Sequence, residues 1–91
     1  MYYVYILESL VDGDFYKGCT ENYEKRLHEH NDGRSQFTRT KMPWKLIFAQ
    51  AFDTKQQALI REKQLKKCNK EYLRWLVQQP TNVLYIKSLD R

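Results

Sequence analysis

The chain opens with an apolar run that predicts a β-strand. Residues 2–7 read Tyr-Tyr-Val-Tyr-Ile-Leu, a β-branched and aromatic composition that strands favour. A turn is expected at residues 11–14, where Gly13 can adopt a positive φ. Residues 15–19 then predict the returning strand of an antiparallel hairpin, and residues 44–52 predict a third strand.

Helical spacing and capping signals alternate with these strands. Three helices are expected, over residues 22–31, 54–67 and 69–79. Asn22 and Asn69 are suited to cap the first and third helices. Thr54 and Gln57 form a capping box at the start of the second helix, and Pro80 should end the third.

The order β-β-α-β-α-α predicts an α+β fold with a small three-stranded antiparallel sheet flanked by helices. The 91 residues suffice for one domain only, which we expect over residues 1–80. Residues 81–91 would form a C-terminal tail whose stretch 83–86 is apolar enough to pack, at a place that the sequence does not specify.

Several classes of protein are excluded by composition. No apolar run approaches the ~18 residues of a membrane span, and no signal-peptide pattern opens the chain, so a cytoplasmic protein without membrane contact is expected. Cys19 and Cys68 are the two cysteines. They are too few for a disulfide framework and lack the spacing of a zinc site.

The net charge of +5 is distributed unevenly along the chain. Residues 1–32 carry seven acids and three bases, whereas residues 33–91 carry four acids and thirteen bases. The excess is concentrated at residues 34–45 and 61–74, both with aromatic neighbours, which suits a polyanion such as nucleic acid. The alternative is an ordinary solvated face of lysines and arginines.

Glu62 is unusual because it falls on the same helical stripe as Ala58 and Leu65, which should face the sheet. A buried charge without compensation is costly. Glu62 could pair with Lys66 one turn later, a surface pair of little energetic weight. Alternatively, it could bind a hard divalent cation such as Mg²⁺, which often takes only one or two carboxylates and completes its shell with water and phosphate.

Arg26 and His30 lie one helical turn apart and should project side by side. An arginine offers a fork for phosphate, and a histidine can move protons near neutral pH. Both could equally be a surface arginine and a half-buried histidine. Tyrosines in the hairpin would usually pack in the core, but a phenol can also orient or deprotonate water.

In combination, these residues resemble the GIY-YIG nuclease signature. Tyr3-Val4-Tyr5 resembles its first triplet and Tyr16-Lys17-Gly18 its second. The remaining matches follow in order: Thr20, Arg26-Leu27, His30-Asn31-x-Gly33, Pro43-Trp44-Lys45-Leu46 and Ala58-x-x-x-Glu62-x-x-Leu65-Lys66. The resemblance covers roughly residues 2–75 and is closest to the compact stand-alone bacterial members.

The resemblance implies a role for each matching residue. Tyr5 and Tyr16 match the two signature tyrosines, which orient or activate water. Arg26 matches the arginine that holds the scissile phosphate, and His30 matches a candidate proton carrier. Glu62 matches the glutamate that binds Mg²⁺ or Mn²⁺. Three further residues are expected to support the site structurally: Tyr3, Gly18 and Thr20.

The resemblance therefore implies a metal-dependent endonuclease that hydrolyses phosphodiester bonds in DNA, with a role in repair or recombination. The small size leads us to expect recognition of backbone or structure rather than sequence, and a monomer or weak homodimer without a small-molecule cofactor. DNA contacts are expected from Lys17, Arg39, Lys41, Lys45 and Lys66. The acidic residues of the hairpin, Glu8, Asp12 and Asp14, should lie away from this surface.

Three departures from the signature leave other readings open. Tyr3 replaces the name-giving glycine, Lys17 replaces isoleucine, and Asn69 is only a loose match to the family's late asparagine. A nucleic-acid-binding module that has lost cleavage is therefore the alternative. A protein-interaction domain for an acidic partner is a third reading.

Overall fold

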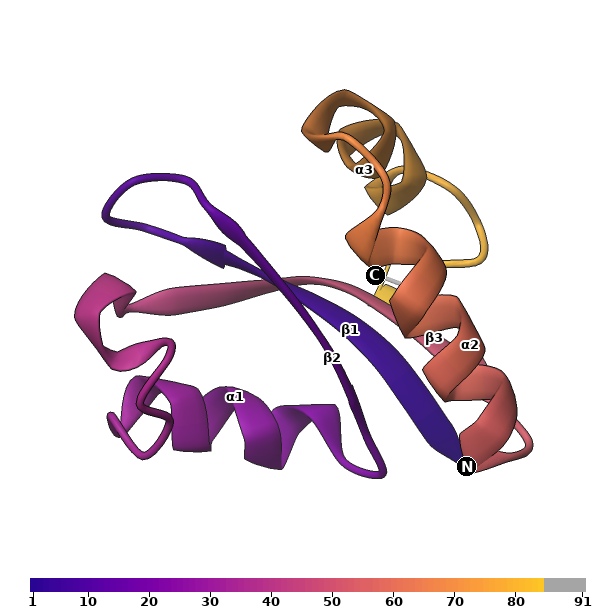
Figure 1. Cartoon of the computed structure of the whole chain (residues 1–91), viewed down its shortest axis with the longest axis horizontal. Coiled ribbons are helices and arrows are strands. Elements are labelled where there is room, and N and C mark those ends of the chain that lie inside the picture. Colours follow the sequence, from indigo (N-terminus) through magenta and orange to yellow (C-terminus); the bar gives the residue numbers. More distant parts are fainter. Residues whose placement is uncertain (85–91) are drawn as a thin grey trace.

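The computed structural model describes residues 1–84 and confirms the predicted α+β class (Figure 1). The elements are β1 (Tyr2–Ser9), β2 (Phe15–Thr20), α1 (Tyr23–Asn31), a 3₁₀ turn η1 (Arg39–Lys41), β3 (Trp44–Phe52), α2 (Lys55–Lys66) and α3 (Lys70–Val77). The expected order β-β-α-β-α-α is therefore correct. The short η1 turn lies between the first expected helix and the third expected strand, where the sequence predicted neither a helix nor a strand.

The three strands form one antiparallel sheet in the order β2-β1-β3. Tyr5 of β1 lies opposite Gly18 of β2 on one side and Ala49 of β3 on the other. The pairing of β1 with β3 shifts register between Ile6 and Leu7. The central strand is thus β1, and β2 forms an edge of the sheet.

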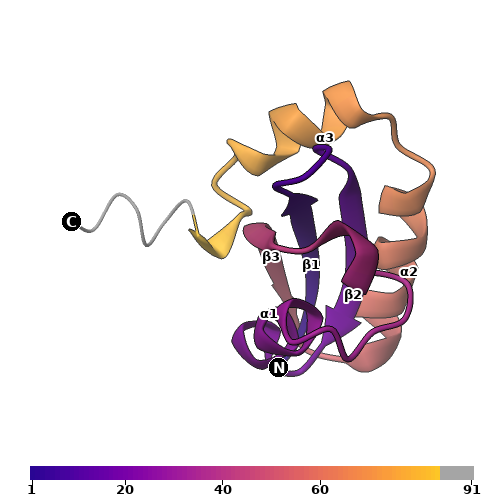
Figure 2. The ribbon, with the colours of Figure 1, turned by 90° about the vertical axis from the view of Figure 1, so that its left-hand side faces the viewer.

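Helices cover both faces of this sheet, α1 one face and α2 with α3 the other (Figures 1 and 2). Because side chains alternate along a strand, Val4 and Ile6 pack with the α2 and α3 residues Ala58, Leu65 and Leu73. The alternate positions form a second cluster on the α1 face, whose members are Tyr5, Leu7, Tyr23, Trp44 and Ala49. The central strand is therefore buried on both sides.

Side-chain caps begin the three α-helices where the sequence predicted them. Asn22 accepts from the backbone of Lys25, and Asn69 accepts from that of Tyr72. Thr54 caps α2 in a complete capping box. α3 ends at Val77, before Pro80, and the hydrogen bonds of residues 78 and 79 continue as tighter turns.

The start of the expected tail is part of the packed structure. Asn82 is buried and joins β3 to the end of α3, accepting from the Ala49 N–H and donating to the carbonyls of Ile47 and Val77. Val83 and Leu84 pack against the α1-side cluster. Residues 85–91 lie outside the described part, including half of the apolar stretch 83–86, and the boundary at residue 80 stays a prediction.

Across residues 1–84, none of the helices has the length and apolar character that crossing a bilayer requires.

Candidate active site

The two signature triplets meet at one cross-strand pair, Tyr5 and Gly18. The Tyr5 side chain lies across the glycine, so closely that a Cβ atom at position 18 would be 2.5 Å from the phenol oxygen. Real Cβ atoms do not approach so closely, and residue 18 has no positive φ that would itself demand glycine. The glycine thus makes room for the Tyr5 ring.

A buried hydrogen-bond chain links this tyrosine to α1 and the following loop. The Tyr5 Oη atom lies 3.1 Å from His30 Nε2, and His30 Nδ1 lies 2.7 Å from Thr38 Oγ1. All three residues are at most 1% exposed. Since His30 comes from the last turn of α1 and Thr38 from the cap of η1, three segments converge on the phenol.

Burial controls the protonation of this chain. It raises the pKa of Tyr5 to about 12, although the nearby Arg26 opposes the rise. It lowers the pKa of His30, and the positive charge of Arg26 lowers it further. At neutral pH the residues are therefore a phenol and a neutral imidazole.

Arg26 stands at the phenol end of the chain. Its guanidinium donates to Glu29 at 2.7 Å, and its side chain is 37% exposed. Arg26 also acts on the ionisation of Tyr5, which places it beside the phenol as the i, i+4 spacing with His30 predicted. Glu29 thus holds a half-exposed guanidinium close to Tyr5.

Tyr16, the second signature tyrosine, packs on the same face. Its ring centroid is 4.8 Å from that of His30 and 6.3 Å from those of Tyr5 and Trp44. The Trp44 indole donates to the Thr38 carbonyl, which fixes the loop beside the ring. Both signature tyrosines and His30 therefore belong to one aromatic cluster.

Glu62 approaches this cluster from α2, on the opposite face of the sheet. Its side chain is 18% exposed and accepts from Lys66 Nζ at 2.8 Å. Its charge acts on Tyr5, and Tyr16 acts on Lys66, whose pKa is raised chiefly by Glu62. Because β2 is an edge strand, side chains from the two faces of the sheet can approach each other around it. The candidate site therefore lies along that edge.

The Glu62–Lys66 pair bears on both readings of this glutamate. The ion pair suggested by the spacing is present, and it shows that the half-buried carboxylate holds a cation. Among residues 1–84, no three His, Cys, Asp or Glu side chains gather where they could share a metal ion. A single hard oxygen ligand suits Mg²⁺ or Mn²⁺, which retains waters and takes phosphate oxygens.

Lys41 is placed otherwise than the sequence suggested. It forms ion pairs with Asp12, at 2.9 Å, and with Asp14. The expectation that these acids lie away from Lys41 is wrong, because the chain after α1 returns across the hairpin tip, where Ser9 binds the Lys41 carbonyl. A DNA contact by Lys41 would require it to leave both carboxylates.

Glu8 and Lys45 are cross-strand partners on the face that carries α3, where Glu8 lies 3.7 Å from Arg74. Lys45 is therefore on the other side of the sheet from Tyr5 and Tyr16. Lys17 pairs with Ile6 and also points to the α2 side. The DNA contacts of these lysines stay predictions.

Two of the expected supporting residues, Tyr3 and Thr20, organise the start of α1. Tyr3 packs edge-on against Tyr23, with ring centroids 5.0 Å apart. The Thr20 hydroxyl accepts from the Asn22 N–H at 3.1 Å. Both residues thereby fix the position of the helix that carries Arg26.

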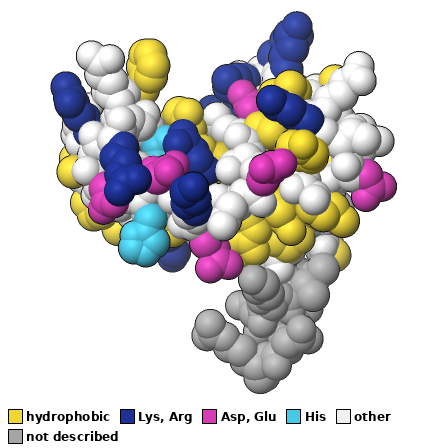
Figure 3. All heavy atoms as spheres, turned by 90° about the horizontal axis from the view of Figure 1, so that it is seen from below, with side chains coloured by type: hydrophobic (Ala, Val, Ile, Leu, Met, Phe, Trp, Pro, Cys, Tyr) yellow, Lys and Arg dark blue, Asp and Glu magenta, His cyan; other side chains and the backbone are white. Residues whose placement is uncertain are grey.

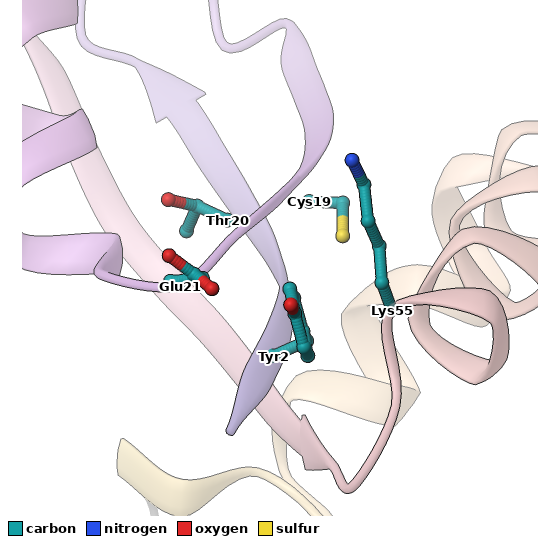
Figure 4. A pocket seen from close by; sticks show the side chains of 5 residues that line it. All are labelled: Tyr2, Cys19, Thr20, Glu21 and Lys55. Atoms are coloured by element: carbon teal, nitrogen blue, oxygen red, sulfur yellow. The ribbon is translucent and has the colours of Figure 1, made fainter.

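A pocket of about 300 Å³ opens at the end of β2, lined by Tyr2, Cys19, Thr20, Glu21 and Lys55 (Figure 4). The neighbouring Glu21 carboxylate raises the pKa of the Tyr2 phenol. The Cys19 thiol has its pKa raised by burial and by Glu62. This pocket therefore adjoins the α2 side of the candidate site.

Two residues of the site were not identified from the sequence. Thr38 stands alone in a basic loop and no local pattern marks it. Glu29 could have been found, because its i, i+3 spacing from Arg26 predicts an ion pair. Over α1, acidic and basic side chains are interspersed and do not form a patch of one sign (Figure 3).

Comparison with known proteins identifies the family of this chain. Residues 1–74 match the model of the GIY-YIG catalytic domain, and the chain belongs to that family. A UPF0213 protein of Bacillus licheniformis is 46% identical over 74 residues, covering 77% of this chain and 75% of the relative. One from Haloquadratum walsbyi is 36% identical over 83 residues, covering 90% and 92%.

A solved structure supports the fold as well. The solution NMR structure of a UPF0213 protein from Bacillus halodurans has a TM-score of 0.57 and 31% identity, covering 93% of this chain and 92% of the other. Membership of the GIY-YIG family implies a nuclease with a nucleic-acid substrate, and nucleases of this family generally use divalent metal ions.

Proposed function

We propose that this chain is a metal-dependent endonuclease that hydrolyses phosphodiester bonds in DNA, recognising backbone or structure rather than sequence. The observation that carries the proposal is the convergence of Tyr5, His30 and Arg26 at the β2 edge, with Glu62 reaching the same edge from α2. Together, a phenol, a guanidinium and a carboxylate can orient water, stabilise developing negative charge and hold a metal ion, which are tasks in phosphodiester hydrolysis.

Each residue has a defined task in this mechanism. Tyr5 or Tyr16 orients the attacking water or takes part in its activation. Arg26 neutralises the charge that develops on the non-bridging phosphate oxygens, using the N–H groups that do not bind Glu29. Glu62 would hold the Mg²⁺ or Mn²⁺ ion, which supplies stabilisation of the leaving oxygen when bound.

DNA would lie along the β2 edge, between α2 and the loop after α1. Lys66 stands beside Glu62, and Arg39 is exposed in that loop. Phe37, 87% exposed, lies two residues before Arg39. An exposed ring beside cations suits stacking on an unpaired base together with phosphate contact. We include Lys17 in this surface. We further propose that the protein is cytoplasmic and that it is a monomer or a weak homodimer.

The experiment is a cleavage panel of branched, flapped, nicked, single-stranded and duplex DNA, with RNA alongside, in Mg²⁺ or Mn²⁺ and again with EDTA. We expect metal-dependent cuts in at least one DNA substrate and none with EDTA. A protein that binds these DNAs but cuts none of them with either metal would instead be the binding module, for which the Glu62–Lys66 pair is merely structural.

A further inference from the structure

Thr38 occupies the capping position of η1, yet its hydroxyl does not cap that turn. The side chain points inward and meets His30 Nδ1 at 2.7 Å. Its backbone is held independently, because the Thr38 N–H donates to Ser35 and the Thr38 carbonyl accepts from Trp44. A threonine at a helix start would ordinarily use its oxygen as a cap, so its engagement with His30 is a specific contact.

Counting hydrogens leaves two possible arrangements of these hydrogen bonds. The Thr38 hydroxyl, a neutral His30 ring and the Tyr5 phenol carry three hydrogens between them, whereas the chain has two hydrogen bonds. One hydrogen is therefore left over, on Thr38 or on Tyr5. Burial and the adjacent Arg26 lower the pKa of His30, which supports the neutral ring assumed in this count.

The two ends of the chain differ in what could accept the third hydrogen. Thr38 is 1% exposed, and within residues 1–84 its hydroxyl has no partner other than His30. A hydroxyl hydrogen without an acceptor there would cost the free energy of desolvating a buried donor. Tyr5 is equally buried, but its oxygen lies against Gly18, which has no side chain, and beside Arg26, whose side chain is 37% exposed. The opening that a phosphate or water would need in order to accept the hydrogen therefore lies at the Tyr5 end.

We propose that Thr38 is a positioning residue that donates to Nδ1 and holds His30 in the Nε2–H tautomer, so that His30 donates its hydrogen bond to the Tyr5 oxygen. The phenol hydrogen then points toward the β2 edge. In the proposed nuclease, on which this consequence rests, the phenol proton passes to a water or phosphate oxygen at that edge, and the His30 N–H stabilises the negative charge left on the Tyr5 oxygen.

The tautomer can be measured without any cleavage assay. Ring-¹⁵N-histidine labelling and long-range ¹H–¹⁵N correlation at neutral pH distinguish the two ring nitrogens. Exposed His28, the other histidine, is the internal reference. We expect one Nε2–H tautomer for His30. An Nδ1–H ring, or a tautomer mixture like that of His28, would overturn the proposal.

Two substitutions assign the effect to the hydroxyl. Thr38→Ser keeps the donor and should keep the tautomer, whereas Thr38→Val keeps the shape and should lose the single Nε2–H state. Cleavage should fall about tenfold in Thr38→Val with unchanged KM, and recover in Thr38→Ser. An unchanged His30 spectrum in folded Thr38→Val would refute the role of Thr38. If Thr38→Val does not fold, the wild-type and Thr38→Ser spectra still decide.

These spectra do not depend on activity. An inactive protein with the expected tautomer would therefore contradict the proposed function and would leave the positioning role of Thr38 intact.

Discussion

The Tyr5 phenol fills the space in which a side chain at residue 18 would lie. Any Cβ at residue 18 would lie 2.5 Å from Tyr5 Oη and 2.6 Å from Cζ. Both atoms belong to a side chain that is 1% exposed and bound to His30. The ring therefore cannot move aside without disturbing the hydrogen-bond chain.

Gly18→Ala should consequently displace Tyr5 and destabilise the fold by about 1–3 kcal/mol, the usual range for overpacking. Cleavage should fall with it, because the Tyr5–His30 bond is lost. Urea unfolding measures the first effect. Cys19→Ala, on the same strand, is the control for substitution by alanine. A Gly18→Ala protein as stable and as active as that control would show that the ring has room to shift.

Tyr5→Phe removes only the hydroxyl and leaves His30 Nε2 without its buried partner. We expect cleavage to fall by about 10²-fold or more, as for loss of a group that assists proton transfer, and stability to fall by about 1 kcal/mol. Tyr72→Phe, an exposed tyrosine on α3, is the matched control. Cleavage by Tyr5→Phe at the control rate would remove the phenol from the mechanism.

Stability should decline in mild acid because of His30. Its pKa in the folded state lies below the ordinary value of 6.5, since burial and Arg26 disfavour the charged ring, although Glu29 partly opposes them. The unfolded chain therefore takes up the proton first, and the free energy of unfolding decreases as the pH falls below about 6.5.

Thermal unfolding between pH 7.5 and 5 measures this decline. His30→Gln should flatten the pH dependence over that window, whereas His28→Gln should leave it unchanged. Equal slopes for wild type and His30→Gln would mean that another group controls stability there.

Arg39 and Lys41 provide a test of where DNA lies. Within residues 1–84 no acidic side chain forms an ion pair with Arg39, while Lys41 is held by Asp12 and Asp14. Arg39→Ala should reduce the slope of log K against log salt by about one phosphate contact. Lys41→Ala should change it less. The reverse order would place the DNA over the hairpin tip.

Phe37 tests whether unpaired bases take part in binding. Phe37→Ala should weaken the binding of single-stranded or flapped DNA by about 1–3 kcal/mol while affecting intact duplex little, because stacking requires an exposed base face. Phe37→Trp should retain affinity. Fluorescence anisotropy with both kinds of DNA makes the comparison, and equal losses on duplex and single strands would argue against stacking.

Local signals account for what could be predicted from the sequence. Asn22, Thr54 and Asn69 cap their helices through bonds to residues three positions away, so spacing alone identifies them. The Arg26 and His30 pair was likewise visible as one turn of helix. Glu62 was visible from its place on the helical stripe, and the family resemblance joined it with Tyr5 in one site, which no single periodicity would have done.

Contacts between distant segments account for the rest. Asn82 closes on β3 across 33 and 35 residues, and Lys41 reaches Asp12 across 29. Neither pair is encoded in a spacing, since each depends on how the hairpin, the loop and the end of α3 meet in space. Thr38 was missed for the same reason, because its importance comes only from the position of the His30 ring.

The most direct test of the nuclease assignment is metal-dependent cleavage by Glu62→Gln beside Glu71→Gln. Glu71 is an exposed acid in the first turn of α3, so both substitutions remove one negative charge. We predict that Glu62→Gln binds DNA but does not cut it in Mg²⁺ or Mn²⁺, while Glu71→Gln cuts like the wild type. Cleavage by Glu62→Gln at the wild-type rate, or cleavage by the wild type that persists in EDTA, would contradict the account.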